Sequence, residues 1–148
     1  MANVVSSLRT RSHSAYRLNY HLVLSMKYRH KCLTAPMLDR IEMILRDLLH
    51  QWGCELVEFG GEADHVHLLL ETPPTVKLSN LVKNLKSVTA RRMRKEFASE
   101  LAPYYWKPSF WNRAYALISV GGRTNIETLL RYIEHQDDPR KPGQTHER

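Results

Sequence analysis

The sequence predicts a ferredoxin-like α+β fold, with an antiparallel four-stranded sheet built in the order β-α-β-β-α-β, helices on one face and one further C-terminal helix. Two observations lead to this prediction. Short runs rich in branched and aromatic residues alternate with two long segments whose apolar residues recur every three or four positions. With 148 residues, 43% of them hydrophobic and 25% charged, the chain has the size and composition of one globular domain.

The first half of this domain is expected to contain three strands and one helix. Residues 16–28 are rich in aromatic and branched side chains, which is typical of a strand. A helix is expected between Pro36, suited to its first turn, and Gly53, suited to its end. Residues 54–59 and 65–71 are apolar runs separated by GGEAD, which predicts a hairpin with a five-residue loop. The buried face of the helix should consist of Leu38, Ile41, Leu45, Leu48 and Trp52.

The second half should contain the longest helix, the fourth strand and the last helix. Residues 76–101 follow a helical apolar period, and residues 114–120 read as a strand. The last helix is expected over residues 125–135. Its apolar side is expected to consist of Ile126, Leu129, Leu130 and Ile133.

The two ends of the chain are polar and without periodicity. We therefore expect a flexible N-terminus over residues 1–15, a single domain over 16–136 and a flexible tail over 137–148. No apolar run approaches the roughly 20 residues that span a bilayer. The two cysteines, Cys32 and Cys54, lack the spacing of a metal site and are not needed as a disulfide. These features favour a cytoplasmic protein.

The charge of the chain favours a polyanionic partner. Lysine and arginine number 22 against 15 acidic residues, which gives a formal net charge of +7. A basic domain of this kind is typical of nucleic-acid binders, although a merely basic soluble protein would have the same composition. The sequence contains neither a GxxxxGK[ST] nor a GxGxxG run, so it predicts no nucleotide-phosphate loop.

Two histidines form the first candidate site. His65 and His67 stand at the start of a predicted strand, and because strand side chains alternate, both imidazoles should project from the same face. Such a pair can bind one metal ion, with Asp64 as a hydrogen-bond acceptor that orients one ring. The alternative is that both histidines are only half-buried residues of a sheet face and that Asp64 is only a turn residue.

A second candidate site lies on the last predicted helix. Tyr132 and Gln136 are four residues apart, so their side chains lie one turn from each other at the edge of the apolar face. A side chain at such an edge can face a cleft. The alternative is a tyrosine that packs at the margin of the core and a glutamine in solvent.

Four segments together closely resemble one family, the HUH (His-hydrophobe-His) single-tyrosine transposases of the insertion sequence 200/605 group. They are KYRHK at residues 27–31, DHVHLLL at 64–70, FWN at 110–112 and RYIEHQ at 131–136. Their order and spacing match the family from about residue 16 to residue 136. This implies an enzyme that cleaves and rejoins single-stranded DNA at hairpin-flanked ends of an insertion sequence, by metal-assisted transesterification through a 5′-phosphotyrosine.

The resemblance also implies a role for individual residues. Tyr132 would be the nucleophile, and His65, His67 and Gln136 would hold Mg²⁺ or Mn²⁺. The active protein would be a homodimer in which the tyrosine helix of one subunit can serve the histidine pair of the other. A hinge at Gly121 and Gly122 would permit that exchange.

Basic and aromatic residues supply candidate DNA contacts. Lys83, Lys86 and Arg94 follow one stripe of the longest helix, and their role would be to hold phosphates, although a solvated helix face would look the same. Unpaired bases could stack on the aromatic residues Tyr28, Tyr104, Tyr105, Trp106 and Trp111, several of which could instead belong to the core. The candidate phosphate contacts are Lys27, Arg29, Lys31, Lys83, Lys86, Arg91, Arg92 and Arg94.

Three alternatives remain open at this stage. A relaxase or replication-initiator nuclease uses a similar histidine pair and tyrosine, but usually within a longer chain. A non-catalytic nucleic-acid-binding module is a second alternative, since four-stranded sheets of this kind commonly bind RNA, but it would leave the histidines, Tyr132 and Gln136 without a role. A domesticated relative that binds palindromes without transposition would retain the same residues.

Overall fold

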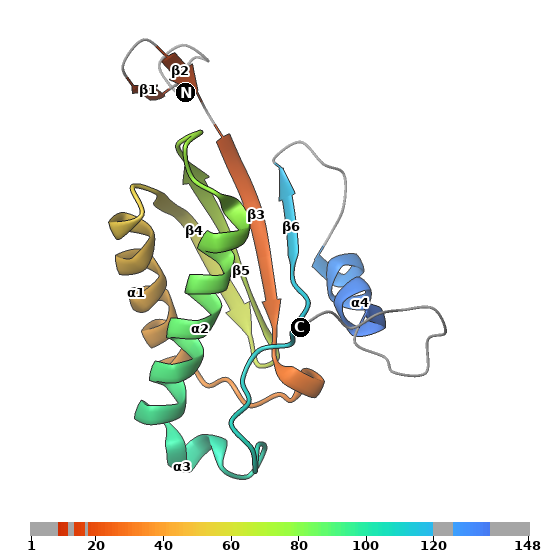
Figure 1. Cartoon of the computed structure of the whole chain (residues 1–148). Coiled ribbons are helices and arrows are strands. Elements are labelled where there is room, and N and C mark those ends of the chain that lie inside the picture. Colours follow the sequence, from red (N-terminus) through yellow and green to blue (C-terminus); the bar gives the residue numbers. More distant parts are fainter. Residues whose placement is uncertain (1–8, 12–13, 17, 120–125, 137–148) are drawn as a thin grey trace.

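The computed structural model describes residues 9–11, 14–16, 18–119 and 126–136. Its main sheet is antiparallel, with the strand order β4-β5-β3-β6 (Figure 1). The predicted ferredoxin-like α+β arrangement is confirmed. The sheet consists of β3 (Leu18–Ser25), β4 (Glu55–Glu62), β5 (His65–Thr72) and β6 (Ala116–Ser119). The helices are α1 (Ala35–Gln51), α2 (Leu78–Glu96), the short α3 (Ala98–Leu101) and α4 (Ile126–Gln136), with a 3-10 turn η1 (Lys27–Arg29) after β3.

Two short strands lie ahead of the main sheet and have no counterpart in the sequence prediction. β1 (Arg9–Arg11) and β2 (Ser14–Tyr16) pair with each other in an antiparallel sheet of their own. Three-residue strands carry too few residues to show an alternating pattern. The C-terminal tail at 137–148 and the glycine pair at 121–122 lie outside the described residues.

The two faces of the main sheet are covered by different helices. Figure 1 shows α1 and α2 side by side across one face. Beneath them, Leu22 and Leu24 of β3 and Val66 and Leu68 of β5 are fully buried in the main core. The residues between them in sequence point to the opposite face, where α4 packs on β3 and β6. This second, smaller core contains Val23, Ala116, Leu130 and Ile133.

Helix α1 begins and ends where its sequence predicts. The hydroxyl of Thr34 accepts a hydrogen bond from the Met37 amide at 3.4 Å, and a proline occupies the first turn. Gly53 follows the helix at φ +74°, a left-handed conformation that favours glycine. Of the predicted buried face, Ile41 and Leu45 are fully buried, whereas Leu38, Leu48 and Trp52 are half-buried against the core.

The β4–β5 hairpin differs from the prediction in its loop. The strands continue to Glu62 and resume at His65, so the connection has two residues, 63 and 64, and not five. Gly60 and Gly61 therefore lie inside β4, opposite His67 and Val66. A Cβ atom at either glycine would approach neighbouring atoms to within 2.8 Å or less, so these glycines serve close packing and not a turn.

The first strand and the longest helix are shorter than predicted. β3 ends at Ser25, an isolated antiparallel bridge pairs Met26 with Trp111, and residues 27–29 form η1. The helix predicted over residues 76–101 is interrupted at Phe97, whose φ of −122° and ψ of 38° are not helical. The bridge joins segments that are distant in the sequence, which a local pattern does not contain.

Asn112 provides a test of how the connection before β6 is held. Its buried side-chain amide donates to the Ser25 hydroxyl at 2.6 Å and to the Met26 carbonyl at 3.1 Å. Asn112→Leu leaves those buried oxygens without this donor, so we expect the free energy of unfolding in urea to fall by about 1–3 kcal/mol. The same change at exposed Asn80 of α2 should alter it by no more than about 0.5 kcal/mol. Equal effects at the two positions would contradict this role.

Candidate active site

His65 and His67 project from the same face of β5, as strand alternation predicts. They pair across the sheet with Ser25 and Val23 of β3, and their ring centroids lie 6.1 Å apart with planes inclined by 29°. Because Val23 belongs to the small core under α4, both imidazoles lie on the face that α4 covers. The main core on the other face is therefore separate from this pair.

Asp64 fixes the orientation of the first imidazole. The Nδ1 atom of His65 lies 2.8 Å from Asp64 Oδ1, and both residues are buried. Burial alone would raise the pKa of the Asp64 carboxyl, but the hydrogen bonds from His65 and Arg29 outweigh it and lower the pKa below its usual value. An ionised carboxylate only accepts hydrogen bonds, so Nδ1 of His65 donates, and Nε2 retains its lone pair in the neutral ring.

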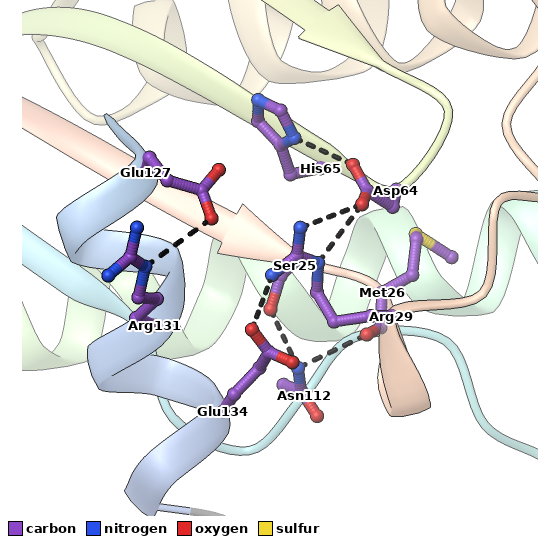
Figure 2. A network of polar contacts seen from close by, with 9 residues as sticks. All are labelled: Ser25, Met26, Arg29, Asp64, His65, Asn112, Glu127, Arg131 and Glu134. Carbon is purple, nitrogen blue, oxygen red and sulfur yellow. Dashed lines mark hydrogen bonds and ion pairs between the residues drawn. The ribbon is translucent and has the colours of Figure 1, made fainter. Parts of the chain in front are cut away.

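Arg29 connects Asp64 to the last helix, as Figure 2 shows. Its guanidinium donates to Asp64 Oδ2 from Nε at 3.0 Å and from Nη2 at 2.9 Å, and to Glu134 of α4 from Nη1 at 2.7 Å. Tyr28 and Arg29 have φ values of 62° and 54°, in a region that costs a non-glycine residue roughly 1–2 kcal/mol. Two such residues in succession mark a turn whose shape is imposed by its contacts, here the ion pairs of Arg29.

His67 has a different environment. Its Nδ1 atom is buried and has no hydrogen-bond partner within the part of the chain that the structure describes. Burial is the main cause that lowers the pKa of this imidazole, and the neighbouring His65 and His21 lower it further, against a smaller opposing effect of Glu62 and Glu58. His67 is therefore neutral near pH 7, which is the form that can bind a metal ion.

Gly60 makes room for the ring of His67. A Cβ atom at this position would lie 2.6 Å from His67 Nε2 and 2.8 Å from Cε1. In the sequence Gly60 reads as a loop residue, so this contact was not predicted. A glycine opposite a candidate ligand in a strand pair is the signal that would have indicated it.

The two histidines line a pocket of about 550 Å³, which lies between β5, α4 and the segment that follows η1. Arg29 and Lys31 bring positive charge to this pocket, and Glu62, Asp64 and Glu127 bring negative charge. Hereafter we call it the histidine pocket. Its remaining lining residues are Ala63, His65, His67, Ile126 and Leu130.

Tyr132 and Gln136 do not line the histidine pocket. Helix α4 faces it with Glu127 and Leu130, and at about 100° per residue Tyr132 lies about 140° and 160° round the axis from these two residues. Gln136 lies one turn after Tyr132 and is half-buried, and Tyr132 is 54% exposed. Within one subunit the described structure thus brings together the two histidines with Asp64 and Arg29, and it turns the tyrosine side of α4 away from them.

The candidate phosphate contacts divide between two places. Lys27, Lys83, Lys86 and Arg94 line a second pocket of about 500 Å³ between α2 and residues 108–115, which we call the basic groove. Arg29 and Lys31 line the histidine pocket, whereas Arg91 and Arg92 line neither pocket, and Arg92 Nε lies 3.6 Å from Glu96. Arg113 also lines the basic groove and was not among the residues predicted from the sequence.

Lys86 has a structural role in the basic groove. Its ammonium group donates to the carbonyl oxygens of Asn112 and Arg113 at 2.7 and 2.6 Å and lies 5.5 Å from the centre of the Tyr115 ring. Lysine at this position therefore holds the wall of the groove. Lys83 and Arg94 are on the same stripe of α2 and present their charges to the groove itself.

The aromatic candidates also separate into two groups. Trp111 is buried and donates from Nε1 to the Thr89 hydroxyl at 2.9 Å, and the Tyr105 hydroxyl donates to the Lys27 carbonyl at 2.8 Å. These two residues support the fold. Tyr28, Tyr104 and Trp106 are exposed and remain candidates for contact with bases.

The sequence was compared with known families and with individual proteins. The sequence matches the family described as IS200-like transposases over residues 14–136. It is 37% identical over 123 residues to the ISDra2 transposase TnpA of Deinococcus radiodurans, covering 83% of this chain and 86% of that protein. It is 30% identical over 133 residues to the transposase for insertion sequence element IS200 of Salmonella typhimurium, covering 90% and 86%.

Two solved structures have the same fold. The crystal structure of a Deinococcus radiodurans protein described as a transposase superimposes with a TM-score of 0.76 at 36% identity, covering 86% of this chain and 97% of that one. A REP-associated tyrosine transposase bound to a REP hairpin superimposes with a TM-score of 0.51 at 9% identity, covering 84% and 69%. At 9% identity the second likeness concerns the fold alone.

The contact between Gly60 and His67 can be tested by a double-mutant cycle. Gly60→Ala places a methyl group against the His67 ring, so we expect the free energy of unfolding in urea to fall by about 1–3 kcal/mol. In a His67→Ala background the methyl group meets no ring, and the same change should be neutral or stabilising by up to about 1 kcal/mol. An equal loss in both backgrounds would show that Gly60 is needed by the strand and not by His67.

Proposed function

Because the chain belongs to the family of IS200-like transposases, enzymes that cut and rejoin DNA, we propose that it acts on single-stranded DNA through a covalent bond to Tyr132. The observation that carries this proposal is the histidine pocket, where two imidazoles lie side by side with one of them oriented by a buried carboxylate. Arg29 and Lys31 border the same pocket, together with the carboxylates of Glu62, Asp64 and Glu127.

We propose that His65, His67 and Gln136 hold Mg²⁺ or Mn²⁺. The residues fit a metal: because Nδ1 of His65 is held by Asp64, its Nε2 is the atom left to bind a cation, and the buried Nδ1 of His67 has no hydrogen-bond partner among the described residues. The described residues include no group of three or more His, Cys, Asp or Glu that could hold a metal ion, and we propose the Gln136 amide oxygen as the third protein ligand. When bound, the metal supplies positive charge that neutralises the scissile phosphate.

Tyr132 would carry out the covalent step. Its phenolic oxygen attacks phosphorus, the bond from phosphorus to the 3′ oxygen breaks, and the phenol proton is balanced by the proton that the departing 3′-hydroxyl takes up. The product is a 5′-phosphotyrosine and a free 3′-hydroxyl. Because a phosphodiester bond is retained, a 3′-hydroxyl of another strand can reverse the step without nucleotide fuel, in agreement with the lack of a phosphate-binding loop motif in the sequence.

We propose further that the working unit is a homodimer with shared active sites. In one subunit the side of α4 that carries Tyr132 and Gln136 is turned away from the histidine pocket, and the Tyr132 side chain is more than half exposed. A tyrosine placed in this way is better suited to reach a histidine pair that belongs to a second subunit. The glycine pair at 121–122, outside the described residues, is the proposed hinge.

The DNA partner is proposed to be single-stranded DNA with hairpins. The basic groove offers lysine and arginine side chains from α2 and the 108–115 segment, which suits the phosphate backbone of a hairpin stem. Phosphate contacts of this kind hold the DNA in place without reading its sequence. The described residues include no helix that is long and apolar enough to cross a membrane.

Two rival functions predict other outcomes. A relaxase or replication-initiator nuclease would form the same type of tyrosine adduct, but on DNA unrelated to the flanks of its own gene. A palindrome-binding protein without transposition activity would bind those flanks and form no adduct. The buried Asp64–His65 pair favours catalysis over binding alone, because binding DNA does not require an imidazole with a fixed tautomer.

Covalent capture of DNA tests the proposed nucleophile. With Mn²⁺ or Mg²⁺ and labelled single-stranded hairpin oligonucleotides from the flanks of the gene, we expect a protein–DNA adduct on a denaturing gel. Tyr132→Phe removes the nucleophilic oxygen and should reduce the adduct below detection. Tyr104→Phe removes the hydroxyl of another exposed tyrosine but keeps a ring that can stack on a base, so it should leave the adduct intact. An adduct that persists in Tyr132→Phe would contradict the assignment, and wild-type protein that forms none on any flank would favour a binding protein.

Mixed dimers test whether active sites are shared between subunits. Tyr132→Phe and His65→Ala chains are each expected to be inactive alone, since one lacks the nucleophile and the other a metal ligand. Co-expressed with two different affinity tags and purified as heterodimers, they should recover up to about half of the wild-type cleavage rate, because one complete site can form from the two intact elements. Heterodimers that recover no cleavage would exclude exchange of the tyrosine helix.

A further inference from the structure

Trp106 is the most exposed large hydrophobic side chain that the structure describes. It is 87% exposed, whereas Trp52 is half-buried with its N–H on Asn84 and Trp111 is buried with its N–H on Thr89. The ammonium group of Lys107 lies over the indole, 4.8 Å from the ring centre. An indole in this position, with a cation beside it, forms a surface for a flat and polar partner and not part of the core.

A groove runs beside this indole. It has a volume of about 350 Å³, and the end of α2, helix α3 and the segment that follows line it. Ala98, Leu101 and Ala102 make an apolar wall, while Arg94 and Lys107 bring two positive charges. None of the described residues that line it is acidic. We call it the Trp106 groove.

The Trp106 groove adjoins the basic groove, since Arg94, Pro108 and Ser109 line both of them. An apolar pocket with an aromatic wall thus lies next to a groove lined by lysine and arginine. This is the alternation of base and phosphate that a nucleic-acid strand presents.

We propose that the Trp106 groove holds an unpaired nucleobase of DNA stacked on the indole, while the adjoining phosphates lie along the basic groove. The proposal deepens the function proposed above, since it assigns a base-binding site to the same DNA partner. It requires an unpaired base, because in a duplex each base face is covered by its neighbours and is closed to a side chain. A loop or a flanking single strand of a hairpin supplies such a base.

The charges around the indole favour DNA over a second copy of this chain. Arg94 and Lys107 border the Trp106 groove, and Lys83 and Lys27 continue along the basic groove. A second copy would bring a net charge of +7 against this surface, which is unfavourable, whereas a DNA strand brings one negative charge per nucleotide.

Fluorescence of the full-length protein without added metal tests the proposal, because DNA can then bind without being cleaved. With a 12-nucleotide single strand we expect quenching of tryptophan emission that Trp106→Phe abolishes, with affinity retained within about threefold since phenylalanine also stacks. Trp106→Ala should weaken binding by about 5- to 150-fold, the range for loss of one stacked base. A blunt duplex of the same sequence should leave Trp106 emission unchanged.

The proposal would be overturned if Trp106→Ala bound the single strand as tightly as the wild type, or if the duplex quenched tryptophan emission as strongly as the single strand. It would also be overturned if the wild type sedimented as a dimer and Trp106→Ala as a monomer, because the indole would then belong to a subunit contact. Failure of the proposed function is a separate outcome. If no adduct forms at Tyr132 but Trp106→Ala weakens binding, the base site stands without the transposase chemistry. If the adduct forms but Trp106→Ala binds as well as the wild type, the base site alone is rejected.

Discussion

The candidate active site depends on the hydrogen bonds that the carboxylate of Asp64 accepts. One of its oxygens accepts from His65, and the other accepts two hydrogen bonds from Arg29, which in turn reaches Glu134 of α4. A buried carboxylate is unfavourable unless it is paired and hydrogen-bonded, so the two partners are needed to keep it ionised. The same contacts orient an imidazole, hold a left-handed turn at residues 28–29 and dock the last helix.

One face of the sheet carries the main core, and the other carries the candidate active site. Val66 and Leu68 point into the main core beneath α1 and α2, while His65 and His67, next to them in sequence, point to the side of α4. The small core that contains Leu130 holds α4 against the sheet beside the histidine pocket.

Much of this arrangement could be predicted from local patterns, and the remainder depends on contacts between distant segments. The alternation of β5 was sufficient to place His65 and His67 on one face, and the helical period was sufficient for α1. Gly60 looked like a loop residue, because its role is to leave space for a ring on the neighbouring strand. The orientation of Tyr132 away from the histidine pocket follows from how α4 docks, which a helical spacing does not contain.

Pulsed electron paramagnetic resonance of Mn²⁺ bound to the protein tests most directly our proposal that the two histidines of this network are metal ligands. We expect nitrogen couplings from two imidazoles in the wild-type protein, and from one imidazole in both His65→Ala and His67→Ala. Bound Mn²⁺ without any imidazole coupling, or with couplings that neither substitution changes, would contradict it.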